Sequence, residues 1–201
     1  TTTPAVTPTA GQVEIGFVPR STVSVGQVDG GQYLAISVTF DELVKGHGEQ
    51  PASWNVQLIG DGIRALEELY DVIIVDSTDP IGPGEVLFTD TFYGHAKRAL
   101  APGGILVTQN GVPFLQGEEL TNSMRAFKAL FSDATCYMAT VPTYAGGPMA
   151  FGWGTDGAAR SVTLKDLTER FATAGIACDY YTPEVHKAAF ALPGYVLKLM
   201  P

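Results

Sequence analysis

Two carboxylates three residues apart, Asp76 and Asp79, directly follow residues 72–75, which read Val-Ile-Ile-Val. A continuous run of branched apolar residues predicts a strand buried on both faces of a parallel sheet. A carboxylate that ends such a strand lies at the carboxyl edge, where open α/β sheets bind ligands. Two carboxylates there can hold an ammonium group, or accept its proton as the nitrogen becomes a nucleophile. Either aspartate alone could instead cap the next helix or stabilise a turn.

The segment after this pair is rich in residues that shape loops. Four of the five residues at 80–84 are proline or glycine. Proline fixes its backbone while glycine permits unusual turns, so the sequence predicts a shaped loop that is able to close over the strand end.

Other polar residues follow neighbouring predicted strands or lie in glycine-rich turns. They are Asp61 with Gly62, Gln109 with Asn110, and Tyr144. An acidic side chain at 61 can accept a hydrogen bond from an adenine amino group, although Asp-Gly most often forms only a turn. The amides at 109 and 110 could contact a ligand or could satisfy nearby loop backbone. The tyrosine hydroxyl could hydrogen-bond an amine or orient a carboxylate.

The elements that must position these residues alternate between strand and helix. We expect strands at 13–18, 22–28, 56–59, 72–75, 105–108, 136–141 and 150–154, and helical segments at 40–45, 63–69, 89–100, 118–131 and 164–174, with a turn at 102–104. This order predicts an α/β fold with a mostly parallel, helix-covered sheet and an antiparallel edge near the carboxyl terminus. Residues 1–12 are expected to form a flexible lead-in, and 13–201 a single domain that is divergent over 13–54.

Composition excludes several classes of partner. The 201 residues include 12 basic and 21 acidic ones, for a net charge of −9. This charge disfavours nucleic acids and anionic membranes as main partners and favours a cationic or neutral ligand. No apolar run approaches the roughly 20 residues of a membrane span, and residues 1–10 lack a signal-peptide pattern, so a cytoplasmic protein is expected. Cys136 and Cys178 have no metal-ligand spacing and are expected to be small buried apolar residues.

Three segments together resemble the spermidine synthase (polyamine aminopropyltransferase) family. They are YDVIIVDSTDPIGPGEVLFTDTFYGHAKRALAPGGILVTQN at 70–110, VPTYAGG at 141–147 and YYTPEVHKAAFALP at 180–193. The resemblance runs from about residue 55 to the carboxyl terminus. It implies a Rossmann-like fold of the class I methyltransferase type. It also implies transfer of an aminopropyl group from decarboxylated S-adenosylmethionine to a diamine, usually putrescine.

The resemblance also implies roles for individual residues. Asp76 matches the catalytic aspartate that binds and helps deprotonate the attacking amine, and Asp79 matches a carboxylate that anchors the diamine. Tyr144 matches a tyrosine that assists the nucleophilic nitrogen. The remaining matches are Asp61 and Gly62, which read the adenine, Pro83, which lines that pocket, Gln109 at a polar strand end, and His186, which we interpret as structural. An alkyl sulfonium is already activated, so we expect no metal and no cofactor beyond the co-substrate.

The amino-terminal part departs from the family pattern. The family's initial β-rich domain has almost no room before the resembling part, and its glycine-rich nucleoside loop has no counterpart in residues 11–24. The best match to the acidic end of the second strand is 26–29, where Gln27 would hydrogen-bond the ribose more weakly than a carboxylate would. Three hypotheses therefore stay open: a compact aminopropyltransferase, a non-catalytic or truncated polyamine-binding homologue, and an amine methyltransferase that uses S-adenosylmethionine. Formation of a homodimer also stays open.

Overall fold

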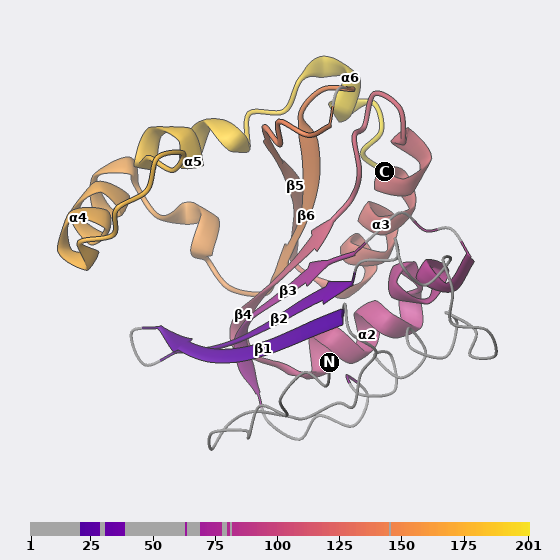
Figure 1. Ribbon diagram of the computed structural model, residues 1–201, viewed down its shortest axis with the longest axis horizontal. Helices are drawn as coiled ribbons and strands as arrows, with labels where there is room; N and C mark the ends of the chain where they lie inside the picture. Colours follow the sequence, from indigo (N-terminus) through magenta and orange to yellow (C-terminus); the bar gives the residue numbers. More distant parts are fainter. Residues whose placement is uncertain are drawn as a thin grey trace, which may run out of the picture. The chain divides into compact units, whose positions relative to one another are not determined.

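A computed structural model describes residues 21–28, 31–38, 63, 69–77, 80, 82–144 and 146–201. The chain divides into two compact units, Thr1–Leu106 and Val107–Pro201, and each is described by itself. Figure 1 shows the ribbon with its elements labelled. The elements predicted at 13–18, 40–45 and 56–59, and all of the helix predicted at 63–69 except Ile63 and Leu69, lie outside the described residues.

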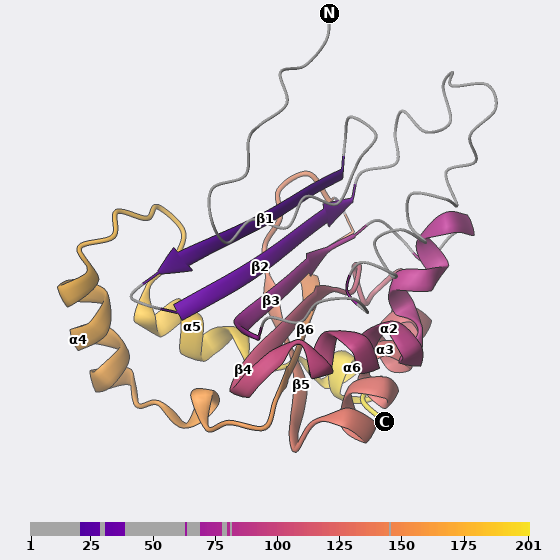
Figure 2. The ribbon, with the colours of Figure 1, turned by 90° about the horizontal axis from the view of Figure 1, so that it is seen from below.

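The first unit contains a hairpin joined to a parallel pair of strands. Strand β1 (Ser21–Val28) runs antiparallel to β2 (Gly31–Val38), and β2 runs parallel to β3 (Tyr70–Asp76). Figure 2 shows the opposite directions of β1 and β2. The order in this unit is β1-β2-β3-β4. The strand predicted at 22–28 is confirmed, whereas β2 was not predicted.

Strand β3 is not covered along the whole of both faces, which corrects the prediction that both faces are buried. Ile73 and Val75, which share one face, are almost completely buried, whereas Ile74 on the opposite face is 40% exposed. In Figure 1, η1 (Gly82–Phe88) and α2 (Asp90–Arg98) both lie on one side of these strands. The apolar side chains on that side form the core of this unit, and the side chain of Ile74 points away from it.

Helix α2 begins one residue later than predicted and ends two residues earlier. Thr89 is its N-cap, because its hydroxyl accepts a hydrogen bond from Phe92 N at 3.2 Å and donates one to Val86 O at 2.8 Å. An N-cap threonine satisfies backbone N–H groups that the first helical turn leaves unpaired. Phe92 and Tyr93 bury their rings edge to face at 5.9 Å. The N-cap and these two buried rings fix the position of α2, which lies between β3 and β4 in the chain.

The turn predicted at 102–104 instead lies inside strand β4 (Leu100–Gln109). Gly103 has a φ of 78°, a conformation that glycine adopts at low cost. A Cβ at Gly104 would lie 3.0 Å from the carbonyl oxygen of Tyr70 and 3.1 Å from that of Asp71. The two glycines therefore let β4 pass close to β3, and the strand continues where the Pro-Gly-Gly pattern indicated a turn.

In the second unit, α3 packs on an antiparallel strand pair. Its elements are α3 (Gly117–Leu130), β5 (Asp133–Ala139) and β6 (Met149–Thr155), with the strand order β4-β6-β5. Leu120, Met124 and Phe127 of α3 are fully buried. The helix predicted at 118–131, the strand at 150–154 and the antiparallel edge are confirmed.

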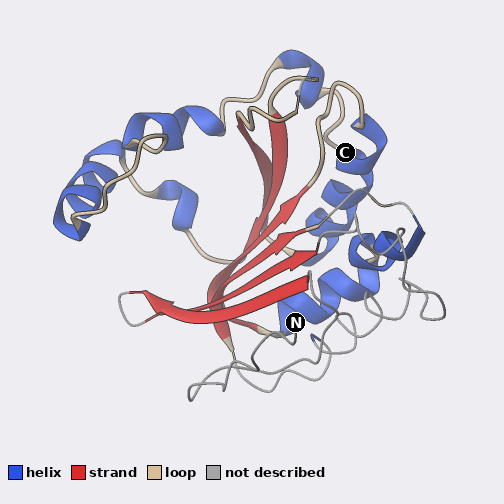
Figure 3. Cartoon of the chain, in the orientation of Figure 1, coloured by secondary structure: helices blue, strands red, loops and turns tan. Residues whose placement is uncertain are grey.

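Four short elements complete this unit: η2 (Ala159–Ser161), α4 (Leu164–Ala174), α5 (Pro183–Ala189) and α6 (Gly194–Leu197). Helix α4 has its predicted bounds but buries no residue completely. Figure 3 shows α3 and α5 on opposite sides of β5 and β6. None of the helices in the part of the chain that the structure describes has the length and apolar character to cross a membrane.

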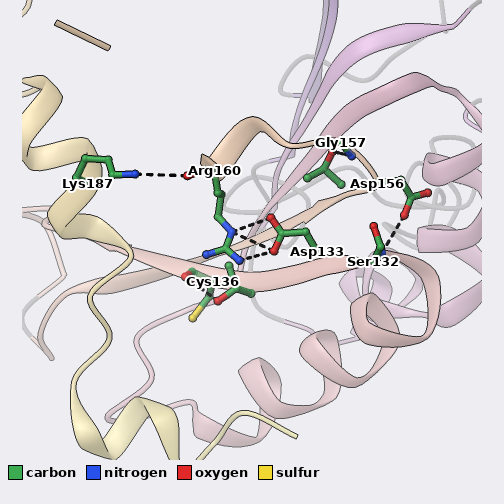
Figure 4. Close-up of polar contacts among 9 residues, drawn as sticks. Ser132, Asp133, Cys136, Asp156, Gly157, Arg160 and Lys187 are labelled. Carbon is green, nitrogen blue, oxygen red and sulfur yellow. Dashed lines mark hydrogen bonds and ion pairs between the residues drawn. The ribbon is translucent and has the colours of Figure 1, made fainter. Parts of the chain in front are cut away.

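A charged contact fixes η2 to β5. The guanidinium of Arg160 donates to both carboxylate oxygens of Asp133, and Lys187 Nζ donates to Arg160 O at 3.4 Å (Figure 4). Lys187 Nζ also donates to Val162 O at 3.1 Å. A two-pronged guanidinium–carboxylate contact also defines the orientation of both groups. These contacts hold α5 near β5, on the side of the sheet opposite α3.

The two cysteines differ, which corrects the expectation that both are buried. Cys136 in β5 is buried, whereas Cys178 is exposed. Burial raises the pKa of Cys136 to about 11, so its reactive thiolate is scarce at neutral pH.

This difference predicts selective labelling. At pH 8, Ellman's reagent should modify one thiol per folded chain rapidly and the second only after unfolding in guanidinium. The Cys178→Ser variant should lose the rapid reaction and keep the slow one. Rapid modification of the Cys178→Ser variant would contradict the burial of Cys136.

Candidate functional site

The carboxyl end of β3 carries Asp76. Asp76 is the last residue of the strand and is exposed, while Ile73 and Val75 before it are buried. The parallel register places Ser37 of β2 beside Asp76. The carboxyl ends of two parallel strands, β2 and β3, therefore meet at this edge. An acidic group at such an edge is in the usual position for ligand binding in open α/β sheets.

The segment after Asp76 is described only in part. Asp61, Gly62 and Asp79 lie outside the described residues. Pro83 belongs to η1, but its side chain is not among those described. Leu87, near the end of η1, is 1% exposed and anchors this short helix to the core. The described part of the Pro- and Gly-rich segment is thus helical from Gly82 onward.

Gln27 lies at the other end of the strands from Asp76. It pairs with Gln32, near the start of β2, whereas Ser37 near the end of β2 pairs with Asp76. Gln27 was predicted to lie at the end of the second strand, among the residues that hold the ribose. That placement is wrong, because β1 is antiparallel to β2 and its carboxyl end meets the amino end of β2. Gln27 therefore does not lie at the edge of the sheet that carries Asp76.

In the second unit, the end of β4 carries Gln109 and Asn110. Gln109 is the last residue of the strand and is 5% exposed. Asn110 is fully buried, and its Oδ1 accepts hydrogen bonds from Thr108 Oγ1 and from Gly152 N, each at 2.8 Å. Asn110 therefore bonds the backbone of strand β6 rather than that of a nearby loop, and its buried Nδ2 has no hydrogen-bond partner among the described residues.

The packing around position 152 requires a glycine, and this requirement was not predicted from the sequence. A Cβ at this position would lie 2.6 Å from Asn110 Oδ1 and 2.7 Å from Thr108 Oγ1. The glycine therefore leaves room for the asparagine to bond the backbone of β6. The available signal was a glycine between Phe151 and Trp153 in a strand, a pattern that often marks close approach of another group.

Tyr144 lies in the loop between β5 and β6. Its side chain is 52% exposed, and its backbone N donates to Val141 O at 3.0 Å. The loop packs against the segment after β4, because a Cβ at Gly146 would lie 2.5 Å from Leu115 Cδ1. Asn110 N also donates to Ala150 O, and Ala150 N to Gly111 O, both at 2.9 Å. The second unit therefore joins the strand end that carries Gln109 to the loop that carries Tyr144.

The predicted residues are thus divided between the units. Asp76 belongs to the first unit, and Gln109 and Tyr144 belong to the second. Among the residues that the structure describes, no three His, Cys, Asp or Glu side chains converge in a way that could hold a metal ion. The described groups offer a carboxylate, an amide and a phenol. Each can hydrogen-bond an amine, and the carboxylate can also accept a proton from it.

Comparisons with known proteins show the family to which the chain belongs. A family profile described as the spermine/spermidine synthase domain matches residues 43–166. A polyamine aminopropyltransferase from Ruegeria sp. (strain TM1040) is 72% identical over 148 residues, which cover 72% of this chain and 52% of that relative. Another from Pseudomonas syringae pv. tomato is 53% identical over 144 residues, which cover 70% and 50%. The chain spans about half the length of these curated relatives.

Solved structures of spermidine synthases are similar in fold to this chain. A spermidine synthase in complex with the transition-state analogue AdoDATO has a TM-score of 0.64 and 31% identity, covering 70% of this chain and 48% of that one. The spermidine synthase from Thermotoga maritima has a TM-score of 0.61 and 30% identity, covering 70% and 47%. These similarities confirm the predicted Rossmann-like α/β fold.

Proposed function

Because the chain belongs to the spermine/spermidine synthase family, we propose that it takes part in aminopropyl transfer from decarboxylated S-adenosylmethionine to a diamine. The diamine is putrescine or a close relative, and the products are spermidine and 5′-methylthioadenosine. The relatives from Ruegeria and Pseudomonas, both named polyamine aminopropyltransferases, support this assignment. The nucleoside is a co-substrate that leaves after each turnover, and the proposal requires no metal.

The observation that carries the proposal is the position of Asp76. Its carboxylate ends β3 at the edge where β2 and β3 both end, and its side chain is exposed. A carboxylate in this position can attract a protonated amine and then accept its proton. Asp79, which lies outside the described residues, is proposed to anchor the far nitrogen of the diamine.

The chemistry requires little beyond positioning and removal of a proton. The amine nitrogen forms a bond to the carbon next to the sulfonium, and the carbon–sulfur bond breaks with its electron pair passing to sulfur. The sulfonium thereby becomes a neutral thioether. A primary amine has a pKa of about 10.4, with lysine as the model, so it is almost entirely protonated at neutral pH. A carboxylate beside it raises that pKa further, so a group must accept the proton as the bond forms. We assign that step to Asp76.

Residues of the second unit are assigned supporting roles in this proposal. The Tyr144 hydroxyl accepts or donates a hydrogen bond at the attacking nitrogen, and the Gln109 amide contacts the substrate from the end of β4. Asp61, Gly62 and Pro83 are assigned to the adenine. Gln27 is not assigned a role, since the register of β1 places it at the opposite end of the strands from Asp76.

The mass of the product tests the proposed function. The chain is incubated with decarboxylated S-adenosylmethionine and putrescine, and the diamine is analysed by mass spectrometry. We expect putrescine to gain one aminopropyl unit, with an equal amount of 5′-methylthioadenosine. A parallel incubation with S-adenosylmethionine serves as the control. Transfer of a methyl group there, or no transfer in either incubation, would contradict the proposal.

A further inference from the structure

A buried polar cluster joins the end of β4 to β6 in the second unit. It consists of Thr108, Asn110 and Gly152. Asn110 Oδ1 accepts hydrogen bonds from Thr108 Oγ1 and Gly152 N, each at 2.8 Å, and both side chains are almost completely buried. Hydrogen bonds away from solvent are stronger than those in water. The polar cluster therefore holds the two strands together at this point.

Helix α3 covers the polar cluster. A Cβ at Gly152 would lie 2.6 Å from Asn110 Oδ1 and 3.0 Å from Met124 Cε of α3. The same Cβ would lie 2.7 Å from Thr108 Oγ1. Thr108 and Asn110 thus direct their side chains to the face of the sheet that packs on α3. Since this packing leaves no room for another substituent, the two side chains have little freedom to move.

Gln109 lies between these two side chains in the sequence. It is the last residue of β4 and is 5% exposed. Successive side chains of a strand point to opposite faces, so Gln109 points away from the face that carries Thr108 and Asn110. Because the polar cluster holds the residue on each side of Gln109, it also sets the direction of the Gln109 side chain.

The backbone pairing beside the polar cluster does not require the side chain of Asn110. Asn110 N donates to Ala150 O, and Ala150 N donates to Gly111 O, both at 2.9 Å. Loss of the side-chain bonds would therefore leave β4 and β6 paired while it gives the backbone at Gln109 more freedom. A displacement of about 1 Å in a group that contacts a substrate can lower a rate by about 10²-fold.

We propose that Asn110 is a positioning residue for aminopropyl transfer. Its side chain, bonded to Thr108 and Gly152, directs the Gln109 amide toward the substrate, and Asn110 itself is fully buried and does not touch the substrate. This role rests on the proposed function, because it requires that Gln109 contacts the substrate during the reaction.

Steady-state rates of 5′-methylthioadenosine release by the full chain test this role. Asn110→Ala removes both bonds of the polar cluster, and Thr108→Val removes one while it keeps nearly the same shape. We expect Gln109→Ala to lower kcat/KM for one of the two substrates. For that same substrate, Asn110→Ala should lower kcat/KM by about tenfold and Thr108→Val by about fivefold. Thr108→Ser keeps the hydroxyl and should retain most of the parental value. If thermal unfolding shows that Asn110→Ala is not folded, Thr108→Val replaces it.

Combination with Gln109→Ala separates positioning from a loss of stability. If Asn110 acts through Gln109, Thr108→Val should lower kcat/KM no further in a chain that already carries Gln109→Ala. The matched control is Thr155→Val. Thr155 is fully buried at the other end of β6, and its hydroxyl accepts a hydrogen bond from Gly157 N at 2.9 Å. This control should leave kcat/KM near the parental value even where it lowers the unfolding temperature.

The outcomes distinguish this role from the proposed function. With an active parental chain, three results would overturn the positioning role alone. They are additive losses from Thr108→Val and Gln109→Ala, an equal loss in Thr155→Val, and parental kinetics of Asn110→Ala or Gln109→Ala. No release of 5′-methylthioadenosine by the parental chain would instead overturn the proposed function, and this role with it.

Discussion

The Asp76→Asn variant is expected to lose aminopropyl transfer by about 10²–10⁴-fold while remaining folded, which is the usual contribution of a positioned general base. Asparagine has nearly the same shape but cannot accept a proton at neutral pH. Since Asp76 is exposed at the end of β3, the substitution disturbs no buried packing. Initial rates of 5′-methylthioadenosine release, compared with the thermal unfolding of both proteins, measure the two effects separately.

Asp71→Asn is the control for this variant. Asp71 belongs to the same strand and is also exposed, but it lies near the amino end of β3. Both substitutions remove one negative charge from this acidic chain, so a general effect of charge on a cationic substrate would appear in both. We expect Asp71→Asn to retain the parental rate. Equal losses in the two variants, or full activity of Asp76→Asn, would remove Asp76 from the mechanism.

Phe127→Ala is expected to lower the free energy of unfolding of the second unit by about 3–5 kcal/mol, the usual cost of removing a buried phenylalanine ring. Phe127 is fully buried, and its ring lies 5.7 Å from that of Phe131. Alanine leaves a cavity between α3 and the strands that the surrounding side chains fill only in part. Urea unfolding followed by far-UV circular dichroism measures the change.

Phe114→Ala is the matched control, because it removes the same ring from a position that is 72% exposed. Its ring contacts Tyr195 at 6.4 Å and has little other packing to lose. We expect a change within about 0.5 kcal/mol, as for most surface substitutions. Similar destabilisation by the two variants would show that α3 does not form the core of this unit.

Local sequence patterns predicted most elements in the second unit and fewer in the first. The spacing of apolar residues in α3 and α4 indicated both helices, and the position of 150–154 after the Pro- and Gly-rich turn region indicated β6. Strand β2 was missed although Leu34, Ile36 and Val38 alternate with smaller or more polar residues. The Pro-Gly-Gly segment of β4 was wrongly predicted to be a turn. Tertiary packing brings β4 close to β3, and this close approach requires glycines, which are also common in turns.

The candidate site was predictable where it depended on strand ends. The run at 72–75 placed Asp76 at the carboxyl end of β3, and the polar pair after 105–108 placed Gln109 at the end of β4. The burial of Asn110 could not be predicted, because its partner Gly152 is 42 residues away in sequence. The predicted position of Gln27 was wrong for a similar reason. Strand direction depends on the hairpin with β2, and the residues of β1 alone carry no signal of it.

Calorimetric titration of putrescine tests the central claim most directly, because it measures diamine capture apart from the later steps. We predict that putrescine binds the parental chain and Asp71→Asn with the same affinity, at one site per chain. Asp76→Asn should bind it at least about tenfold more weakly, a difference of roughly 1.4 kcal/mol. Equal affinity of Asp76→Asn and the parental chain, or no binding by the parental chain, would contradict a diamine site at the end of β3.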